Sequence, residues 1–510
     1  MKTITLGDND LTLEEFHAVC REDATVKLSA SAKDRINKCA KTVNDFVEEG
    51  KTIYGVTTGF GKFSNVFISK EDCSLLQKNL IVTHAVGAGN PFPLDVVRGM
   101  LLLRINNIQK GFSGTRLLTV ETMLEMLNKG VLPHVPEKGS LGASGDLAPL
   151  AHLILPMLGL GLAYYKGELL DGKVAMDKAG IKTIELTAKE GLSLINGTQA
   201  MTSVGALAIY DAINLSKTAD VVAALSVEAH LGITDAFDER LHQIRPHKGQ
   251  LQTAKNLLAL LKGSEMTTRQ AEIRVQDAYS LRCLPQVHGA SKDAINYVKE
   301  HVEIEINSVT DNPIIFSDTN EGISGGNFHG QPMALSFDFL GIALAEYANI
   351  SERRLERLVN PALSGLPAFL VENGGVNSGF MIVQYSAAAL VSENKILAHP
   401  ASVDSIPSSA NQEDHVSMGT IAARKSMEIL KNARRVIAME LMCACQAIDL
   451  RGKKKLGAGT APIYDLVRAS VPTLTEDRPL YEDINKCEQM IIDNKIVELS
   501  EKAMKAEIII

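Results

Sequence analysis

Apolar and polar positions follow two different patterns along this chain. Over residues 1–200, a short alternating stretch at residues 2–6 is followed by segments in which apolar residues recur every three or four positions. The alternation predicts a strand and the longer period predicts helices, and Ser69, Asp72 and Gly130 stand where helix ends belong. We expect a mixed N-terminal domain with helices over residues 12–20, 31–49, 70–84, 94–110 and 116–129.

From residue 201 onward the pattern changes to long amphipathic helices. Apolar side chains recur at steps of three and four through residues 332–358, and a second such run covers residues 416–448. Helices of this length span roughly 40–50 Å, which is typical of a bundle. The sequence predicts a mainly α fold, in which an elongated helical-bundle domain over residues 201–510 follows the smaller mixed domain over residues 1–200.

Residues 147–165 form an uncharged apolar run with nearly the length of a membrane span. Pro149 and Pro156 interrupt the run, and a proline inside a helix removes a backbone hydrogen bond. We therefore expect a buried core segment and no membrane insertion. Beyond it, residues 163–174 predict a small hairpin region with a turn at Asp171-Gly172.

Charge and cysteine content exclude several classes of protein. The 510 residues carry 52 basic and 60 acidic side chains, which gives a net charge of −8, and neither sign forms long blocks. The sequence therefore shows no basic cluster of the kind that binds nucleic acid. The seven scattered cysteines indicate reduced thiols, neither a disulfide framework nor a zinc site. The first residues lack the apolar core of a signal peptide. We expect a cytoplasmic protein.

Ala143, Ser144 and Gly145 form a tripeptide with unusual chemical potential just before an apolar, helix-like run. The amide nitrogen of Gly145 can attack the carbonyl carbon of Ala143 and close a five-membered ring with loss of water. Loss of a second water from the Ser144 side chain gives a methylidene-imidazolone, which is an electrophile. Gly145 has no Cβ to obstruct the approach, and a helix N-terminus stabilises nearby negative charge.

The tripeptide has two other interpretations. It is compatible with an ordinary turn that places a serine near a helix cap. A hydrolase nucleophile elbow requires Gly-x-Ser-x-Gly, but Asp146 stands where the last glycine belongs, so that spacing fails. The interpretation as an electrophile therefore depends on the rest of the chain.

Several polar clusters elsewhere match this chemistry. Each has an ordinary structural explanation by itself, but with the tripeptide they make the whole chain resemble the aromatic amino-acid ammonia-lyases, whose electrophile is the methylidene-imidazolone, and within them the lyases that act on histidine. The resemblance implies a fold of the ammonia-lyase and fumarase type. The matching stretches are residues 54–61, 139–152, 196–199, 276–289, 374–380 and 399–418.

The resemblance implies a role for each matching residue. The Ser144-derived methylidene would capture the substrate's amino group and make it a better leaving group. Tyr54 matches the tyrosine that removes the β-proton. Arg282 matches the position that binds the substrate carboxylate, because a planar guanidinium can grip both oxygens. Three residues match positions that orient the electrophile and substrate, and a fourth matches a wall of the pocket: Asn196, Gln276 and Tyr279, and Phe328.

The substrate depends on what meets its side chain. Relatives that act on phenylalanine or tyrosine carry glutamine where Glu413 stands and Phe-Leu or His-Leu in the region of Thr83-His84. A carboxylate and an imidazole suit a ring with an N–H donor and a lone pair. The resemblance thus implies L-histidine as substrate, with trans-urocanate and ammonia as products, and Glu413 either binds the ring or also moves a proton.

Two alternatives stay open. Gly330-Gln331 is shared with tyrosine-type lyases and aminomutases, so the same electrophile would serve a tyrosine or phenylalanine lyase or an aminomutase. A noncatalytic helical scaffold is the third hypothesis. In either catalytic case the resemblance implies a homotetramer whose active sites combine residues of several chains, with no metal and no dissociable cofactor.

Overall fold

The computed structural model describes residues 2–61, 65–69 and 72–510, which form two compact units. The first unit combines residues up to Leu207 with Glu300–Asp338 and Pro400–Arg424. The second combines Ala208–Lys299, Phe339–His399 and Lys425–Ile510. The contiguous division at residue 200 remains a prediction. It differs from these units for residues 201–207, 300–338 and 400–424, which belong to the first unit.

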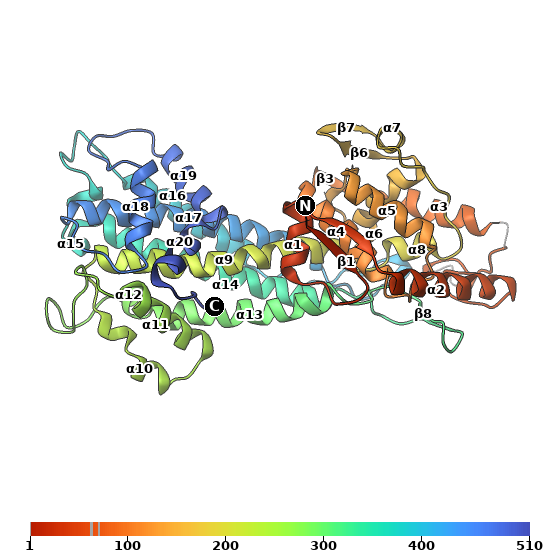
Figure 1. Cartoon of the computed structure of the whole chain (residues 1–510), viewed down its shortest axis with the longest axis horizontal. Helices are drawn as coiled ribbons and strands as arrows, with labels where there is room; N and C mark the ends of the chain where they lie inside the picture. Colours follow the sequence, from red (N-terminus) through yellow and green to blue (C-terminus); the bar gives the residue numbers. More distant parts are fainter. Residues whose placement is uncertain (1, 62–64, 70–71) are drawn as a thin grey trace. The chain divides into compact units, whose positions relative to one another are not determined.

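The first unit mixes helices with short strands (Figure 1). Strands β1 and β2 pair in parallel, β3 pairs antiparallel with β5, β4, β6 and β7 form an antiparallel sheet, and β8 pairs antiparallel with β9. The bounds are β1 Thr3–Leu6, α1 Leu13–Arg21, β2 Thr25–Leu28, α2 Ala30–Glu48, α3 Cys73–His84, β3 Ala88–Pro91, α4 Leu94–Ile108, α5 Leu117–Lys129, β4 Leu132–Pro133, β5 Pro136–Lys138, α6 Leu147–Ile154, β6 Leu162–Tyr165, β7 Glu168–Asp171, α7 Gly172–Lys178, α8 Glu190–Ile195, β8 Ile314–Phe316 and β9 Glu321–Ile323.

The second unit is helical in all its named elements. The chain passes from one unit to the other at five places. Four of them lie within long helices, α9 Gln199–Ala229, α13 Leu284–Glu305, α14 Gln331–Val359 and α17 Gly419–Leu450, and the fifth follows His399. The predicted long helices at residues 332–358 and 416–448 correspond to α14 and α17. The shorter helices of this unit are α10 Glu239–Gln243, α11 Lys248–Leu260, α12 Tyr279–Arg282, α15 Pro361–Ser364, α16 Met381–Leu397, α18 Ala461–Ser470, α19 Tyr481–Ile492 and α20 Lys495–Met504.

The N-terminal helices follow the predicted pattern closely. Helix α1 starts at a capping box in which the Thr12 hydroxyl accepts from the Glu15 N–H and the Glu15 carboxylate accepts from the Thr12 N–H. Helix α5 ends at Gly130, whose φ of 73° lies in the left-handed region that glycine adopts without strain. Helix α3 is described from Cys73, and the predicted residues 70 and 71 lie outside the described part of the chain.

Most of the apolar run after the tripeptide is buried, as predicted, but Leu160 and Leu162 near its end are exposed. Residues Leu147–Ile154 form α6, and Leu155–Leu158 continue it as one 3₁₀ turn. Among the described residues, one helix, α14, is long and apolar enough to cross a membrane, but 67% of its apolar window is buried inside the protein. A core helix of a soluble fold has the same composition.

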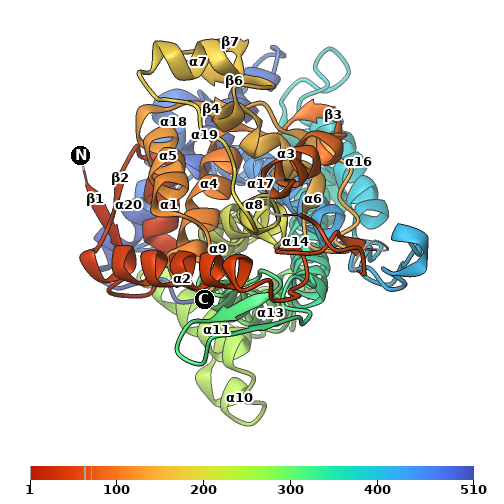
Figure 2. The same cartoon turned by 90° about the vertical axis from the view of Figure 1, so that its right-hand side faces the viewer.

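The predicted turn of the hairpin was wrong. Strands β6 and β7 are joined at Lys166 and Gly167, which both have positive φ, of 50° and 83°. Two such residues suit the twist of a two-residue hairpin loop. Asp171 instead ends β7 and precedes helix α7, which packs beside the same hairpin (Figures 1 and 2).

Candidate active site

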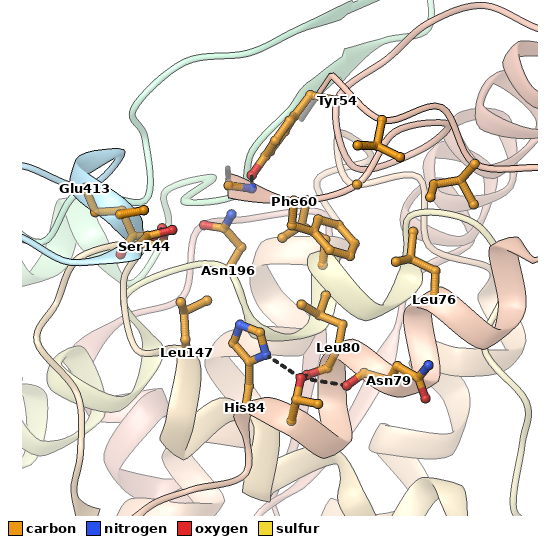
Figure 3. A pocket seen from close by; sticks show the side chains of 18 residues that line it. Tyr54, Phe60, Leu76, Asn79, Leu80, His84, Ser144, Leu147, Asn196 and Glu413 are labelled. Carbon is orange, nitrogen blue, oxygen red and sulfur yellow. Dashed lines mark hydrogen bonds between the residues drawn. The ribbon is translucent and has the colours of Figure 1, made fainter. Parts of the chain in front are cut away.

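A cavity of about 710 Å³ in the first unit brings together residues from five distant parts of the sequence (Figure 3). Five of the predicted site residues line it: Tyr54, His84, Ser144, Asn196 and Glu413. Apolar side chains complete the wall, among them Phe60, Leu76, Leu80, Leu147 and Leu192. Ala143 and Gly145 line a smaller cavity of about 210 Å³ that shares His84, Leu147 and Glu413 with the first.

The backbone of the tripeptide lies against the turn at Gly197. The Gly197 N–H donates to the Ser144 carbonyl at 3.3 Å, and the Gly197 carbonyl accepts from the Asp146 N–H at 2.7 Å. Gly145 has a φ of 72°, and a Cβ there would lie 2.0 Å from the Gly197 oxygen. No larger residue fits at Gly145 without displacing the Gly197 backbone.

The other side of the tripeptide packs against the start of α17. Gly142 has a φ of 66°, and its carbonyl accepts from the Ser417 hydroxyl at 3.1 Å. Ala143 packs in a small apolar cluster with Val416 and Met418. These contacts immobilise the two residues before Ser144 while leaving its hydroxyl in the cavity.

Asp146 anchors the residue that follows the tripeptide. Its fully buried carboxylate accepts from the Ser140 hydroxyl at 2.9 Å, from the Met201 N–H at 2.8 Å and from the Thr420 hydroxyl. Burial raises the pKa of this carboxyl group, and the hydrogen bonds oppose the rise. Asp146 therefore ties the tripeptide to the first turns of both α9 and α17.

A buried cation, Arg104, holds the segment at Asn196. Arg104 in α4 donates both terminal nitrogens to the Asn196 carbonyl at 3.0 Å, one of them also to the Ser193 carbonyl at 2.9 Å, and the other to the Gln199 side chain. Burial lowers the pKa of Arg104 to about 10, so the guanidinium stays charged at neutral pH. Its fork geometry fixes the turn that carries Asn196 and Gly197.

Glu413 faces the serine of the tripeptide. The Ser144 hydroxyl donates to Oε1 of Glu413 at 2.9 Å, and the Ser408 hydroxyl donates to Oε2 at 2.8 Å. Figure 3 shows Glu413 and Ser144 side by side at one end of the cavity. Both carboxylate oxygens thus have a hydroxyl donor in the folded chain, and Oε1 is the oxygen on the cavity side.

His84 ends helix α3 and points into the same cavity (Figure 3). Its Nδ1 lies 3.3 Å from the Thr83 hydroxyl, which itself donates to the Asn79 carbonyl at 2.8 Å. A neutral imidazole has one N–H and one lone pair. Burial lowers the pKa of His84 below its ordinary value, more than the nearby Glu413 charge raises it, so the ring is neutral at neutral pH.

Tyr54 lies on a glycine-rich loop, residues 54–61, and lines the cavity. Its hydroxyl oxygen accepts from the Gly61 N–H at 3.1 Å, and its ring meets Phe60 edge to face at 6.5 Å between centroids. Gly55 in this loop has a φ of 66°, and a Cβ there would lie 2.5 Å from Leu192. The loop is therefore a packed element that holds the phenol over the cavity.

Comparison with known proteins identifies the family of this chain. Residues 11–469 match the family described as aromatic amino acid lyase. The chain belongs to the aromatic amino acid lyase family. A histidine ammonia-lyase of Alkaliphilus oremlandii is 62% identical over 507 residues, covering 99% of this chain and 100% of that protein.

Solved structures of family members have the same fold. The crystal structure of histidine ammonia-lyase from Trypanosoma cruzi matches with a TM-score of 0.92 and 42% identity, covering 99% of this chain and 96% of that one. A tyrosine aminomutase from Streptomyces globisporus matches with a TM-score of 0.95 and 36% identity, covering 99% and 100%. The predicted mainly α lyase fold is confirmed.

Three predicted site residues lie in the second unit and line a different cavity or the surface. Gln276 and Arg282 line a cavity of about 300 Å³ there. Tyr279 is 71% exposed, and the Arg282 guanidinium lies over its ring at 4.6 Å. Phe328 belongs to the first unit, but it is not among the described residues that line the cavity of Ser144. The roles of these four residues remain predictions.

The structure adds supporting residues that the sequence did not single out: Arg104, Asp146, Gly197 and Ser408. Arg104 interrupts a run of apolar residues in α4, which is nearly all buried. A charged residue inside an apolar helix is a signal that it must be paired in the core. The other three lie within the matching stretches 139–152, 196–199 and 399–418, but each is a common residue in a turn, so no local signal distinguishes it.

Proposed function

We propose that this member of the aromatic amino acid lyase family eliminates ammonia from L-histidine and releases trans-urocanate. The observation that carries the proposal is the convergence of Ser144, His84 and Glu413 on one cavity in the first unit. The printed names of the relatives at 62% and 42% identity, over nearly the full chain, support the same substrate.

The tripeptide of residues 143–145 fits the prosthetic group of this family. Gly145 and Gly142 occupy positions where a Cβ would lie within 2.2 Å of neighbouring atoms, and Ala143 is small and packed. The group formed from these residues would supply an electrophilic carbon for the amino group of the substrate. Asn196, at the turn that Arg104 holds, would orient that amino group.

The elimination removes one proton from Cβ and the amino group from Cα, leaving a double bond conjugated with the imidazole and carboxylate. Tyr54 is the proposed base, because its phenol oxygen lines the cavity opposite Ser144 (Figure 3). The apolar wall of Phe60, Leu80 and Leu192 excludes water from the reacting carbon, which strengthens each polar contact that the substrate makes.

Recognition of the imidazole ring rests on Glu413 and His84, which line the same cavity. The carboxylate of Glu413 accepts a hydrogen bond from the N–H of the ring, and the neutral imidazole of His84 is proposed to pair with the other ring nitrogen. The phenyl ring of phenylalanine offers neither a donor nor a lone pair, so it leaves both groups unpaired. Buried polar groups left unpaired reject an analogue strongly.

A tyrosine or phenylalanine substrate, or an aminomutase outcome, is the second candidate, and Gly330-Gln331 motivates it. The Gln331 side chain donates to the Ser402 carbonyl at 3.4 Å, and Gln331 is not among the described residues that line the cavity. The local geometry therefore offers this candidate less support than the histidine lyase.

We further propose that the active site is completed in a homotetramer. Gln276, Tyr279 and Arg282 would reach the substrate from neighbouring chains, with Arg282 binding the carboxylate and Phe328 closing the pocket. The exposure of Tyr279 in the single chain, 71%, supports this arrangement. The assembly would act in the cytoplasm on a free amino acid, with no metal or dissociable cofactor.

The direct test is the ultraviolet absorbance of urocanate after addition of L-histidine to purified protein. We expect a steady rise with L-histidine and little product from L-tyrosine or L-phenylalanine. Detection of cinnamates or β-amino acids would favour the second candidate. No product from any of the three, in protein whose mass shows the loss of two waters, would contradict the lyase assignment; full mass and no turnover would support a scaffold.

A further inference from the structure

The turn of residues 408–413 carries Glu413 in an uncommon backbone conformation. Ser409, Ala410 and Asn411 have φ angles of 51°, 54° and 64°. Residues other than glycine rarely adopt this left-handed region, and three in succession are rarer still. Such a conformation persists only where surrounding contacts impose it, and it marks functional sites.

Ser408 closes this turn at its base. Its N–H donates to the Glu413 carbonyl at 2.9 Å, and its carbonyl accepts from the Glu413 N–H at 3.3 Å. Its hydroxyl donates to Oε2 of Glu413 at 2.8 Å. One residue thus holds both the backbone and the carboxylate of Glu413.

The hydroxyl bond decides which carboxylate oxygen faces the cavity. With Oε2 engaged by Ser408, the remaining oxygen Oε1 points toward Ser144, whose hydroxyl is 2.9 Å away. A carboxylate on a flexible glutamate side chain has several rotamers, and only a second fixed contact selects one. Among the described residues, the Ser408 hydroxyl is the only group outside the tripeptide with a side-chain hydrogen bond to Glu413.

We propose that Ser408 is a positioning residue for the substrate ring, acting through Glu413 and making no contact with the substrate itself. Its hydroxyl holds Oε2 so that Oε1 is presented to an imidazole N–H. The inference rests on the proposed function and adds a residue that determines substrate affinity. It assigns no proton transfer to Ser408.

The test is a double-mutant cycle of Ser408→Ala and Glu413→Gln in the full-length protein. A hydrogen bond to a charged group contributes enough that its loss in Ser408→Ala lowers kcat/KM for L-histidine about tenfold. In the Glu413→Gln background the same change should alter kcat/KM less than about twofold, because the group it positions is gone. The dissociation constant of trans-urocanate, measured by equilibrium titration, should rise by about the factor by which kcat/KM falls.

Two further variants separate positioning from folding. Ser408→Thr keeps the hydroxyl and should restore kcat/KM to within about threefold of the wild type. Ser405→Ala removes a hydroxyl of the same loop that accepts from the Val416 N–H and does not contact Glu413, so it should leave kcat/KM near the wild-type value. The intact mass of every variant reports whether the tripeptide has still lost two waters.

An equal loss of kcat/KM from Ser408→Ala in both backgrounds would overturn the proposal, as would wild-type kinetics and urocanate binding in Ser408→Ala. Failure of the proposed function looks different, because the wild-type protein would then give no urocanate at all. If Ser408→Ala does not fold, failure of Ser408→Thr to restore kcat/KM overturns the proposal by itself.

Discussion

Replacement of Arg104 tests whether the turn at Asn196 depends on a buried cation. Arg104→Met keeps the apolar stem of the side chain and removes the donors to the Ser193 and Asn196 carbonyls and to the Gln199 side chain. Each buried acceptor left without a donor costs about 1–3 kcal/mol. The methionine avoids the cost of burying a charge, so the net loss of stability should be about 2–4 kcal/mol.

The same substitution should also slow ring closure in the tripeptide. Gly197, next to Asn196, hydrogen-bonds the backbone of Ser144 and Asp146, so a loosened turn would no longer hold the residues on either side of Gly145. The protein has no tryptophan, so unfolding in urea is best followed by far-ultraviolet circular dichroism. Mass spectrometry gives the fraction of chains that have lost two waters, and urocanate absorbance gives turnover.

Arg104→Lys is the matched control. It keeps the positive charge but lacks the planar fork that reaches several acceptors, so we expect stability and cyclisation between those of the wild type and Arg104→Met. An Arg104→Met protein with the wild-type urea midpoint and complete cyclisation would refute the reasoning, because the turn would then be held by other contacts.

Four further predictions follow from the site. Ser144→Ala removes the hydroxyl that must leave to form the electrophile, so turnover should fall by more than about a thousandfold while the urea midpoint changes little; wild-type turnover would contradict the role of Ser144. Glu413→Gln should lower kcat/KM for L-histidine by at least about tenfold with little change in the urea midpoint, and unchanged kinetics would remove Glu413 from the ring pocket. Gly197→Ala would place a Cβ 2.6 Å from the buried Gln199 side chain and should abolish soluble, cyclised protein, as measured by yield and mass. The His152 Nε2 accepts from the Gly87 N–H at 3.0 Å, and burial lowers the pKa of His152 below the ordinary value of 6.5. Neutral His152 therefore stabilises the fold fully above about pH 6.5, and this contribution is lost as the pH falls toward the lowered pKa. His152→Gln should flatten the fall of the urea midpoint between about pH 6.5 and 5, and an unchanged pH dependence would contradict this role of His152.

Long helices were predictable from the sequence because their buried apolar side chains recur every three or four residues. Helix α14 begins and ends within one residue of the predicted bounds. Short-range signals were less reliable. Asp171-Gly172 has the composition of a hairpin turn, but Lys166-Gly167 makes the turn and Asp171 precedes α7, because the register of β6 and β7 is set by their packing.

The site could be predicted only through resemblance, since no local pattern brings its parts together. Ser144 and Glu413 are separated by 269 positions. Hydrophobic periodicity predicts helices and strands, but it does not show that the turn before α6 contacts the turn before α17. Arg104 shows a second limit. It lies in a helix whose apolar pattern predicts burial, but its acceptors are backbone carbonyls about 90 positions away, which the sequence does not reveal.

The mass of the tryptic peptide that spans residues 139–166 tests the central claim most directly. In catalytically competent wild-type protein this peptide should be lighter than its sequence requires by two waters. The Ser144→Ala peptide has no hydroxyl to eliminate, so it can lose at most the one water of ring closure. A peptide of full mass from protein that converts L-histidine to urocanate would contradict the account, because turnover would then not depend on an electrophile made from Ala143, Ser144 and Gly145.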